Sequence, residues 1–149
     1  RKCMRPRLVE CSVYDSLKGF PLTLTVGVDV VEVERIRVAV DGAGDLLADL
    51  FTPAEIMECT SRRRSHARLA ACFAVKEAFL KAAGIGLNSG LLFKDIEVVN
   101  QGSGAPELRV SGRVRELTGD TDPAKCLVSS AFTDTLACAV VALQHKGIE

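Results

Sequence analysis

The sequence is poor in aromatic residues: it has no tryptophan and one tyrosine, and aromatic side chains make up 5% of its 149 residues. A hydrophobic core must therefore be built mainly from aliphatic side chains, together with six phenylalanines. The chain also lacks an apolar run of the roughly 20 residues that cross a bilayer, and its start has no continuous signal-type apolar segment. These absences exclude a helical membrane protein and predict a soluble one.

An excess of one charge sign is missing as well, because lysine plus arginine and aspartate plus glutamate number 19 each. The whole molecule therefore carries no field that would attract nucleic acid or a membrane surface, and a charged partner must meet a local patch. A chain of this length suits a single domain with one core.

The cysteines show no paired spacing. The sequence has no CxxC motif, and no histidine is placed to complete a zinc site. We interpret the cysteines as reduced thiols of a cytoplasmic protein rather than as a disulfide framework. Cys72 and Cys138 lie in apolar stretches, where we expect small buried side chains. The six are Cys3, Cys11, Cys59, Cys72, Cys126 and Cys138.

Periodicity divides the chain into an N-terminal extension, residues 1–21, and a domain, residues 22–149. The first segment shows no clear period, whereas residues 22–30 alternate between apolar and polar side chains. This alternation is typical of a half-buried strand, and it puts Asp29 on the polar face. Asp29 and Glu32 have capping-box spacing, so a short helix is predicted to start at Asp29.

The strongest helix signals lie in the middle of the chain. Residues 52–55 read Thr-Pro-Ala-Glu, which combines an N-cap, a proline at the first helical position and a capping glutamate. Residues 65–83 are rich in alanine, leucine, phenylalanine and lysine and predict a long helix that ends at Gly84 and Gly86.

After this helix the pattern becomes that of short strands. Strands are predicted at residues 91–99 and 107–110 around a turn at 100–104, and at 127–132 and 136–143. A short helix can start at Ser111. The sequence therefore predicts an α+β domain without repeats.

Two acidic residues form a candidate metal site. Asp29 ends a predicted strand, and Glu77 follows Leu69 and Phe73 at four-residue steps along one line of the long helix. A carboxylate among apolar neighbours needs a cation or hydrogen bonds, because unpaired buried charge is unfavourable. Two carboxylates, with phosphate and water oxygens, are typical ligands of magnesium.

Each of these residues also has a simpler interpretation. Asp29 alone is more often a helix cap than a metal ligand, and Glu77 and Lys81 have the spacing of a surface ion pair. In the functional interpretation, Lys76 and Lys81, followed by the turn at residues 84–86, hold phosphate oxygens beside the metal.

Four segments resemble the acyl carrier protein synthases, a type of 4'-phosphopantetheinyl transferase. VGVDVVEVERI, residues 26–36, is similar to their opening motif, and FAVKEAFLKAAGIG, residues 73–86, to their second signature. FTPAEI, residues 51–56, and FKDIEV, residues 93–98, resemble the helix start and the strand on either side of that signature. The likeness covers about residues 24–143.

The resemblance implies a small phosphopantetheinyl transferase fold with a long central helix on a mainly antiparallel sheet, commonly assembled as a homotrimer. It implies transfer of 4'-phosphopantetheine from coenzyme A to a serine of apo acyl carrier protein, with magnesium as cofactor and release of 3',5'-ADP. The resemblance would place this activity in fatty acid biosynthesis, and more widely in lipid metabolism.

The resemblance also implies roles for particular residues. Asp29 and Glu77 would bind the metal, and with Lys81 they would form the catalytic set. The carrier protein would dock at Arg35. The coenzyme A phosphates would be bordered by Lys76, Lys81, Gly84 and Gly86.

Three positions depart from the family pattern and favour an alternative. Phe132 stands where the family usually has a histidine, Cys72 where it has an arginine, and Ile85 where it has a threonine. The alternative is a non-catalytic module of the same fold that binds coenzyme A or a carrier protein. In a third interpretation, Asp29 and Glu77 are only a cap and an ion pair in a structural or interaction protein.

Overall fold

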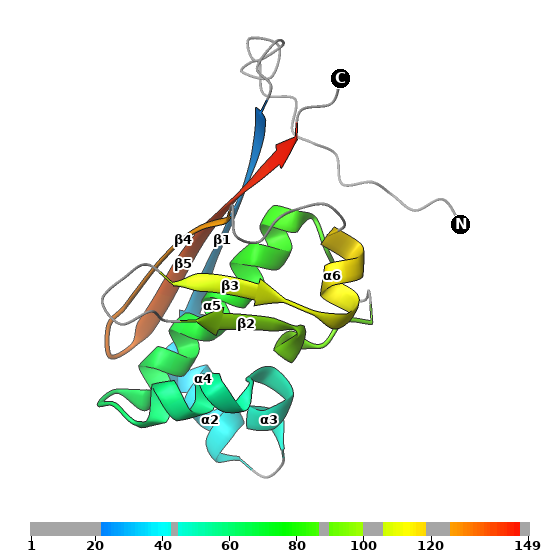
Figure 1. Ribbon diagram of the computed structural model, residues 1–149. Helices are drawn as coiled ribbons and strands as arrows, with labels where there is room; N and C mark the ends of the chain where they lie inside the picture. Colours follow the sequence, from blue (N-terminus) through cyan, green and yellow to red (C-terminus); the bar gives the residue numbers. More distant parts are fainter. Residues whose placement is uncertain (1–21, 43–44, 87–89, 100–105, 119–125, 147–149) are drawn as a thin grey trace.

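The computed structural model describes residues 22–42, 45–86, 90–99, 106–118 and 126–146. They form a three-stranded antiparallel sheet, a two-stranded antiparallel hairpin and the helices between them, so the predicted α+β class is confirmed (Figure 1). The predicted N-terminal extension, residues 1–21, and the predicted turn at 100–104 lie outside the described residues.

The elements follow one another closely along the chain. In order they are β1 (Leu22–Glu32), α2 (Val33–Asp41), α3 (Leu46–Leu50), α4 (Pro53–Thr60), α5 (Ser65–Ala83), the 3-10 helix η2 (Phe93–Asp95), β2 (Ile96–Val99), β3 (Glu107–Val110), α6 (Gly112–Thr118), β4 (Cys126–Phe132) and β5 (Leu136–Lys146).

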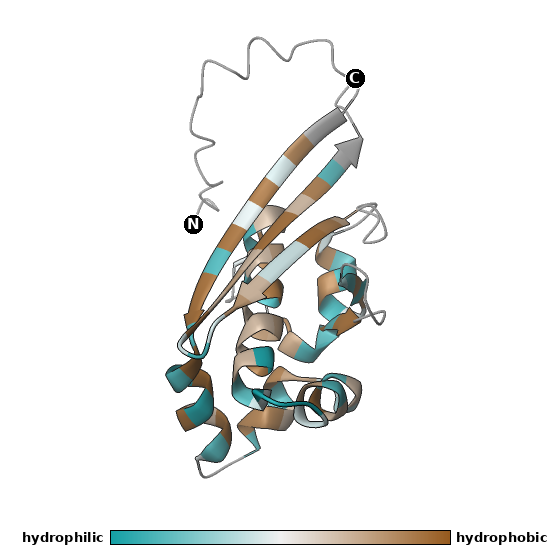
Figure 2. Ribbon diagram, turned by 90° about the vertical axis from the view of Figure 1, so that its left-hand side faces the viewer, coloured by the Kyte–Doolittle hydropathy of each residue, from teal (hydrophilic) through white to brown (hydrophobic). Residues whose placement is uncertain are grey.

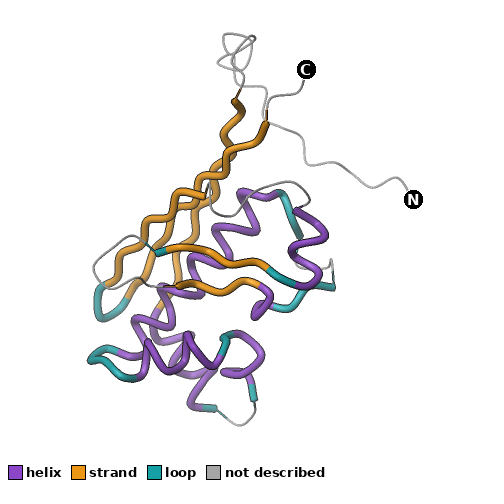
Figure 3. The backbone as a smooth tube through the Cα atoms, in the orientation of Figure 1, coloured by secondary structure: helices purple, strands orange, loops and turns teal. Residues whose placement is uncertain are grey.

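Helix α5 is the centre of the fold and has the predicted bounds. Gly84 ends it in the left-handed conformation, with φ 68°, and donates its backbone N–H to the Lys81 carbonyl. The three-stranded sheet packs on one side of α5 and the β2–β3 hairpin lies on the other (Figures 1 and 3). Because neighbours surround it, α5 buries residues all around its circumference, and Ala70, Ala74 and Ala78 are fully buried.

The three-stranded sheet has the order β1-β5-β4, with β5 in the middle. Its inner face rests on α5, and the closest approach is at Gly27. A Cβ at that position would lie 1.9 Å from the carbonyl oxygen of Ala78. Only glycine therefore allows β1 to pack this closely on the helix backbone.

The apolar residues of β1 lie on the opposite face from the one that α5 covers. Leu24, Val26, Val28 and Val30 point away from α5 and are between 52% and 62% exposed, while the polar face of β1 packs inward. Figure 2 turns this outer face toward the viewer and shows the apolar residues as brown bands along β1. The prediction that β1 buries only one face is correct. The buried face, however, is the one that carries Gly27 and Asp29, and the apolar face is exposed.

Two further predictions need correction. Asp29 is not a helix cap, because β1 continues to Glu32 through pairing of Glu32 with Leu136 of β5, and α2 begins only at Val33. Cys138, predicted to be buried, is exposed on the outer face of β5, whereas Cys72 is buried as predicted.

The strand predicted at residues 91–99 is shorter, Ile96–Val99, because η2 precedes it. Asp95, the last residue of η2, holds the start of α6. Its backbone carbonyl accepts the Ser111 N–H at 2.8 Å, and its carboxylate accepts the Arg113 N–H at 3.2 Å. None of the described helices is both long and apolar enough to span a bilayer.

Candidate functional site

A cleft of about 500 Å³ lies between β1, α2 and α5, and it contains three of the predicted site residues. Asp29 comes from β1, Arg35 from α2 and Glu77 from α5. The remaining walls are apolar, and they comprise Val30, Val31, Ile36, Ala39, Leu46, Leu50, Phe73 and Phe93. Residues far apart in the sequence thus meet in one small volume with two carboxylates and one guanidinium.

The backbone fixes both carboxylates in place. Asp29 pairs with Ala139 in the β1–β5 ladder and lies on the inner face of β1, two residues beyond Gly27. Its side chain is 15% exposed. Glu77 lies in the interior of α5, where the helix hydrogen bonds hold its backbone.

Lys81 lies at the edge of this site and joins α5 to β1. Its ammonium donates to the Asp29 carboxylate at 2.6 Å and to the Val28 carbonyl at 3.1 Å. The ion pair therefore runs between Lys81 and Asp29, in place of the Glu77–Lys81 surface pair of the simpler interpretation. Since the Lys81 side chain is 52% exposed, the ammonium can also face a ligand in solvent.

The electrostatics of Glu77 favour a bound cation. Burial raises the pKa of the Glu77 carboxyl, the negative charge of Asp29 raises it further, and Lys81 acts in the opposite direction. A divalent cation between the two carboxylates would relieve their repulsion, and oxygen donors suit a hard ion such as magnesium. Among the described residues, no group of three or more His, Cys, Asp or Glu side chains could hold a metal ion. The two carboxylates therefore fit magnesium only if phosphate and water complete its shell.

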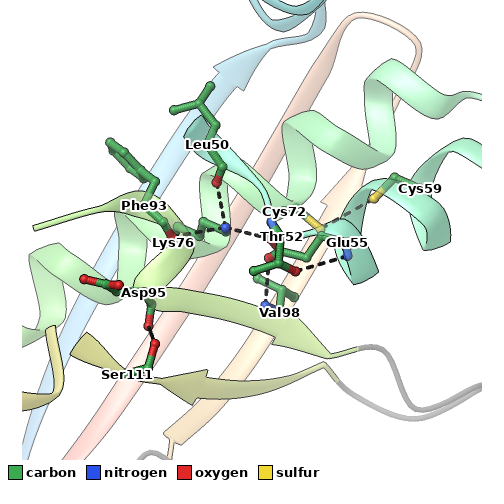
Figure 4. A network of polar contacts seen from close by, with 10 residues as sticks. All are labelled: Leu50, Thr52, Glu55, Cys59, Cys72, Lys76, Phe93, Asp95, Val98 and Ser111. Atoms are coloured by element: carbon green, nitrogen blue, oxygen red, sulfur yellow. Dashed lines mark hydrogen bonds and ion pairs between the residues drawn. The ribbon is translucent and has the colours of Figure 1, made fainter. Parts of the chain in front are cut away.

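Lys76, predicted to hold coenzyme A phosphates, lies in the core instead. Its side chain is 0% exposed, and its ammonium donates to Glu55 at 2.8 Å, to the Leu50 carbonyl at 2.7 Å and to the Phe93 carbonyl at 3.2 Å (Figure 4). With all three donors used inside the protein, the ammonium has none for a phosphate. Its bonds instead hold two walls of the cleft, Leu50 and Phe93, against α5.

Glu55 completes this buried network. Its carboxylate accepts backbone N–H groups from Thr52 and Val98, both at 2.8 Å, in addition to Lys76. The first of these bonds belongs to the predicted capping box of α4. Burial lowers the pKa of Lys76, and the negative charge of Glu55 counteracts it. Glu55 is 2% exposed and cannot act as a general base in the cleft.

Lys76→Met should be strongly destabilising, because it leaves the Glu55 carboxylate buried without its cation. Breaking a buried ion pair on one side costs about 3–5 kcal/mol of unfolding free energy. The double change Glu55→Gln with Lys76→Met removes both charges and keeps an amide oxygen for the Val98 N–H, so it should be less destabilising than Lys76→Met. Urea unfolding of the three proteins tests this. A loss below about 1 kcal/mol for Lys76→Met would contradict the role assigned to the pair.

The other predicted phosphate-binding residues follow the helix. Gly84 and Gly86 lie just beyond the end of α5, one turn after Lys81, and both are exposed. A Cβ at either position would have no neighbouring atom within 4 Å, so their backbone is open to a ligand. Neither lines the cleft itself.

Two of the three departures from the family pattern meet at a second, smaller pocket. Cys72 and Phe132 both line it, together with Arg68 of α5. The Arg68 guanidinium lies 5.5 Å from the centre of the Phe132 ring. A cation is therefore present beside Phe132, although Cys72 supplies none.

Sequence reasoning missed Phe93 and Leu50 as walls of the cleft. Phe93 stacks on Phe73 with ring centres 5.2 Å apart, and both rings line the cleft. The FKDIEV segment drew attention to Phe93 as a strand residue, but nothing in the sequence indicated that η2 would bring it to α5. The backbone carbonyls that bind Lys76 carry no sequence signal at all.

The chain is similar to known proteins over most of its length. Residues 25–141 match the model of the 4'-phosphopantetheinyl transferase superfamily. The holo-[acyl-carrier-protein] synthase of Geobacter sp. (strain M21) is 41% identical over 120 residues, which cover 80% of this chain and 96% of the relative. That of Moorella thermoacetica is 36% identical over 123 residues, covering 83% and 95%.

Solved structures show the same fold. A complex of ACPS with CoA, attributed to Chronobacterium ammoniagenes, has a TM-score of 0.74 at 25% identity and covers 84% of this chain and 99% of its own. A holo-(acyl-carrier-protein) synthase of Bacillus anthracis in complex with CoA (3',5'-ADP) has a TM-score of 0.67 at 27% identity, covering 82% and 96%.

Proposed function

The chain belongs to the 4'-phosphopantetheinyl transferase superfamily, and we propose that it is a holo-acyl-carrier-protein synthase, an enzyme that moves 4'-phosphopantetheine from coenzyme A to a serine of apo acyl carrier protein. The reaction is a phosphoryl transfer that releases 3',5'-ADP. We propose that it depends on magnesium. The relatives at about 40% identity carry the name of this activity, and related structures were solved with CoA.

The observation that carries the proposal is the joint placement of Asp29 and Glu77 in one cleft, with Lys81 bound to Asp29 at its edge. Asp29 and Glu77 would hold the magnesium ion. When bound, the ion would offset the negative charge of the pyrophosphate oxygens during transfer. The Lys81 ammonium, while bound to Asp29, would also donate a hydrogen bond to the reacting phosphate and so orient that phosphate.

We also assign places around the cleft to the rest of the ligand and to the carrier protein. The open backbone at Gly84 and Gly86 would lie along the coenzyme A phosphates. The apolar wall formed by Leu50, Phe73 and Phe93 would exclude water from one side of the reacting groups. Arg35 would attract the acidic carrier protein to the mouth of the cleft. Fatty acid biosynthesis and a cytoplasmic location stay predictions.

The decisive test is the intact mass of an apo acyl carrier protein after incubation with this protein, coenzyme A and magnesium. A phosphopantetheine-sized gain that requires magnesium and disappears with EDTA is expected. Tight binding of coenzyme A without any gain, over several carrier proteins, would favour the non-catalytic module that Phe132, Cys72 and Ile85 suggest. No binding and no gain would reject both.

We propose that the protein assembles as a homotrimer through the outer face of the sheet β1-β5-β4. The ladder places Val26 beside Ala142, Val28 beside Val140 and Val30 beside Cys138, all on that face. Leu127, 72% exposed, extends the same surface onto β4. A continuous apolar sheet surface is rarely left to water, so its exposure in the single chain supports an assembly that would bury it against other copies.

Val28→Asp should dissociate this assembly, because it puts an unpaired charge in the middle of the apolar face. We expect the mass in solution, measured by light scattering after size-exclusion chromatography, to fall from that of a trimer to that of a monomer. Met57→Asp is the matched control, since Met57 of α4 is 69% exposed but away from the sheet. An unchanged mass for Val28→Asp would contradict assembly through this face.

A further inference from the structure

We propose that Cys59 and Cys72 form an oxidation site, at which a small peroxide converts two buried thiols into a reversible disulfide that ties α4 to α5. The two residues are 13 positions apart in sequence and lie on adjacent helices. The inference rests on their geometry and does not depend on the transferase activity.

The two sulfur atoms are already in contact. Their Sγ atoms lie 3.7 Å apart and share a hydrogen bond (Figure 4). Cys59 is 2% exposed and Cys72 is 5% exposed, so the neighbouring side chains hold both thiols facing each other. To form a disulfide, the two sulfur atoms must close from this contact distance to about 2.0 Å.

A reagent can reach the pair although both residues are largely buried. A pocket of about 120 Å³ is lined by Cys59, Cys72, Arg62 and Arg68 and opens to solvent. This volume suits a water-sized oxidant such as hydrogen peroxide and excludes bulky ones. The pocket is distinct from the cleft that holds Asp29 and Glu77.

The environment divides the roles of the two thiols. The hydrogen bond shared with Cys72 is the largest influence on Cys59 and lowers its pKa, with a smaller contribution from the positive charge of Arg68, whereas burial and the negative charges of Glu55 and Glu58 oppose this shift. The same hydrogen bond and burial raise the pKa of Cys72. Cys59 is therefore the thiol that ionises first and attacks an oxidant, and Cys72 is the resolving partner.

The chemistry balances in two steps. The Cys59 thiolate attacks one oxygen of hydrogen peroxide, the O–O bond breaks, and the departing hydroxide takes a proton to become water, leaving a sulfenic acid. The Cys72 sulfur then attacks that sulfur, displaces its hydroxyl group as a second water, and forms the S–S bond. Two thiols are oxidised by two electrons, and the peroxide is reduced by two electrons.

Tryptic digestion makes the product easy to identify in the unmodified full chain. Arginines at positions 62, 63, 64 and 68 lie between the two cysteines, so Cys59 falls in the peptide of residues 38–62 and Cys72 in that of residues 69–76, each without another cysteine. After hydrogen peroxide treatment in native buffer and blocking of free thiols, we expect these two peptides to be joined, and separated again by dithiothreitol.

Cys59→Ser is the control, and the joined peptide must be absent from it. A second readout is thermal unfolding, where the oxidised wild type should melt several degrees above the reduced protein, because the cross-link restricts the unfolded chain. Oxidised Cys59→Ser should show no such rise. Free thiols in both peptides after treatment, or a disulfide that joins either peptide to another cysteine instead, would overturn the proposal.

Discussion

Gly27→Ala should unfold the protein or abolish its activity, the largest effect expected of a Cβ added at any of the described glycines. The added Cβ would lie 1.9 Å from the Ala78 carbonyl oxygen and 2.6 Å from the Ala82 nitrogen, both backbone atoms of α5. Neither backbone atom can move away without breaking hydrogen bonds of α5, so β1 must be displaced instead. Overpacking with flexible side chains already costs about 1–3 kcal/mol, and we expect a loss above that range here.

The measurement is denaturant unfolding, combined with the carrier-protein mass assay on whatever folded fraction remains. Because Asp29 lies two residues beyond Gly27 on the same face of β1, displacement of the strand also moves a carboxylate out of the cleft. For the unfolding measurement alone, Gly86→Ala is the matched control, since a Cβ there has no neighbour within 4 Å. If Gly27→Ala were as stable as Gly86→Ala, the packing of β1 on α5 would have to be different.

Asp29→Asn and Glu77→Gln should each reduce phosphopantetheine transfer by about 100-fold or more, because several kcal/mol of charge stabilisation by the metal would be lost. Both changes keep the size of the side chain, so the fold should persist. Initial rates from the carrier-protein mass assay, at saturating coenzyme A and magnesium, measure the effect. Glu116→Gln, an exposed acid of α6 paired with Arg113, is the matched control and should retain its rate.

Thermal unfolding separates loss of metal binding from loss of chemistry. Magnesium and coenzyme A together should raise the melting temperature of the wild type, because ligands that bind only the native state stabilise it. The rise should shrink in Glu77→Gln. Full activity of either variant would remove Asp29 and Glu77 from the proposed metal site, whatever the thermal data show.

Local signals predicted helices α4 and α5 well. The capping box at Thr52 and Glu55 and the glycine after residue 83 act through atoms close in sequence, so they set the bounds of α4 and the end of α5 in any context. Asp29 and Glu77 were paired as candidate magnesium ligands from their residue types, and the family resemblance implied the same pair. No local rule indicates that β1 packs on α5.

What sequence reasoning misjudged depends on contacts between distant elements. Alternation in β1 cannot tell which face α5 covers, and the rule that apolar residues point inward fails here, because the apolar face of β1 is the exposed one. Lys76 was predicted to bind phosphate because it precedes the glycine turn on α5 and because the family resemblance implied that role. Only the placement of Glu55 and of the Leu50 and Phe93 carbonyls makes a buried ammonium possible.

The order of strands β1-β5-β4 also determines when the protein can fold during synthesis. The central strand is β5, the last described element of the chain. It pairs with β1, the first described element, from Leu22 opposite Lys146 to Glu32 opposite Leu136. Until β5 leaves the ribosome, neither β1 nor β4 has its partner, and one side of α5 stays uncovered. Such long-range pairing slows folding and leaves apolar surface exposed in the nascent chain. A nascent chain stalled before residue 136 should therefore be bound by chaperones and digested by proteases.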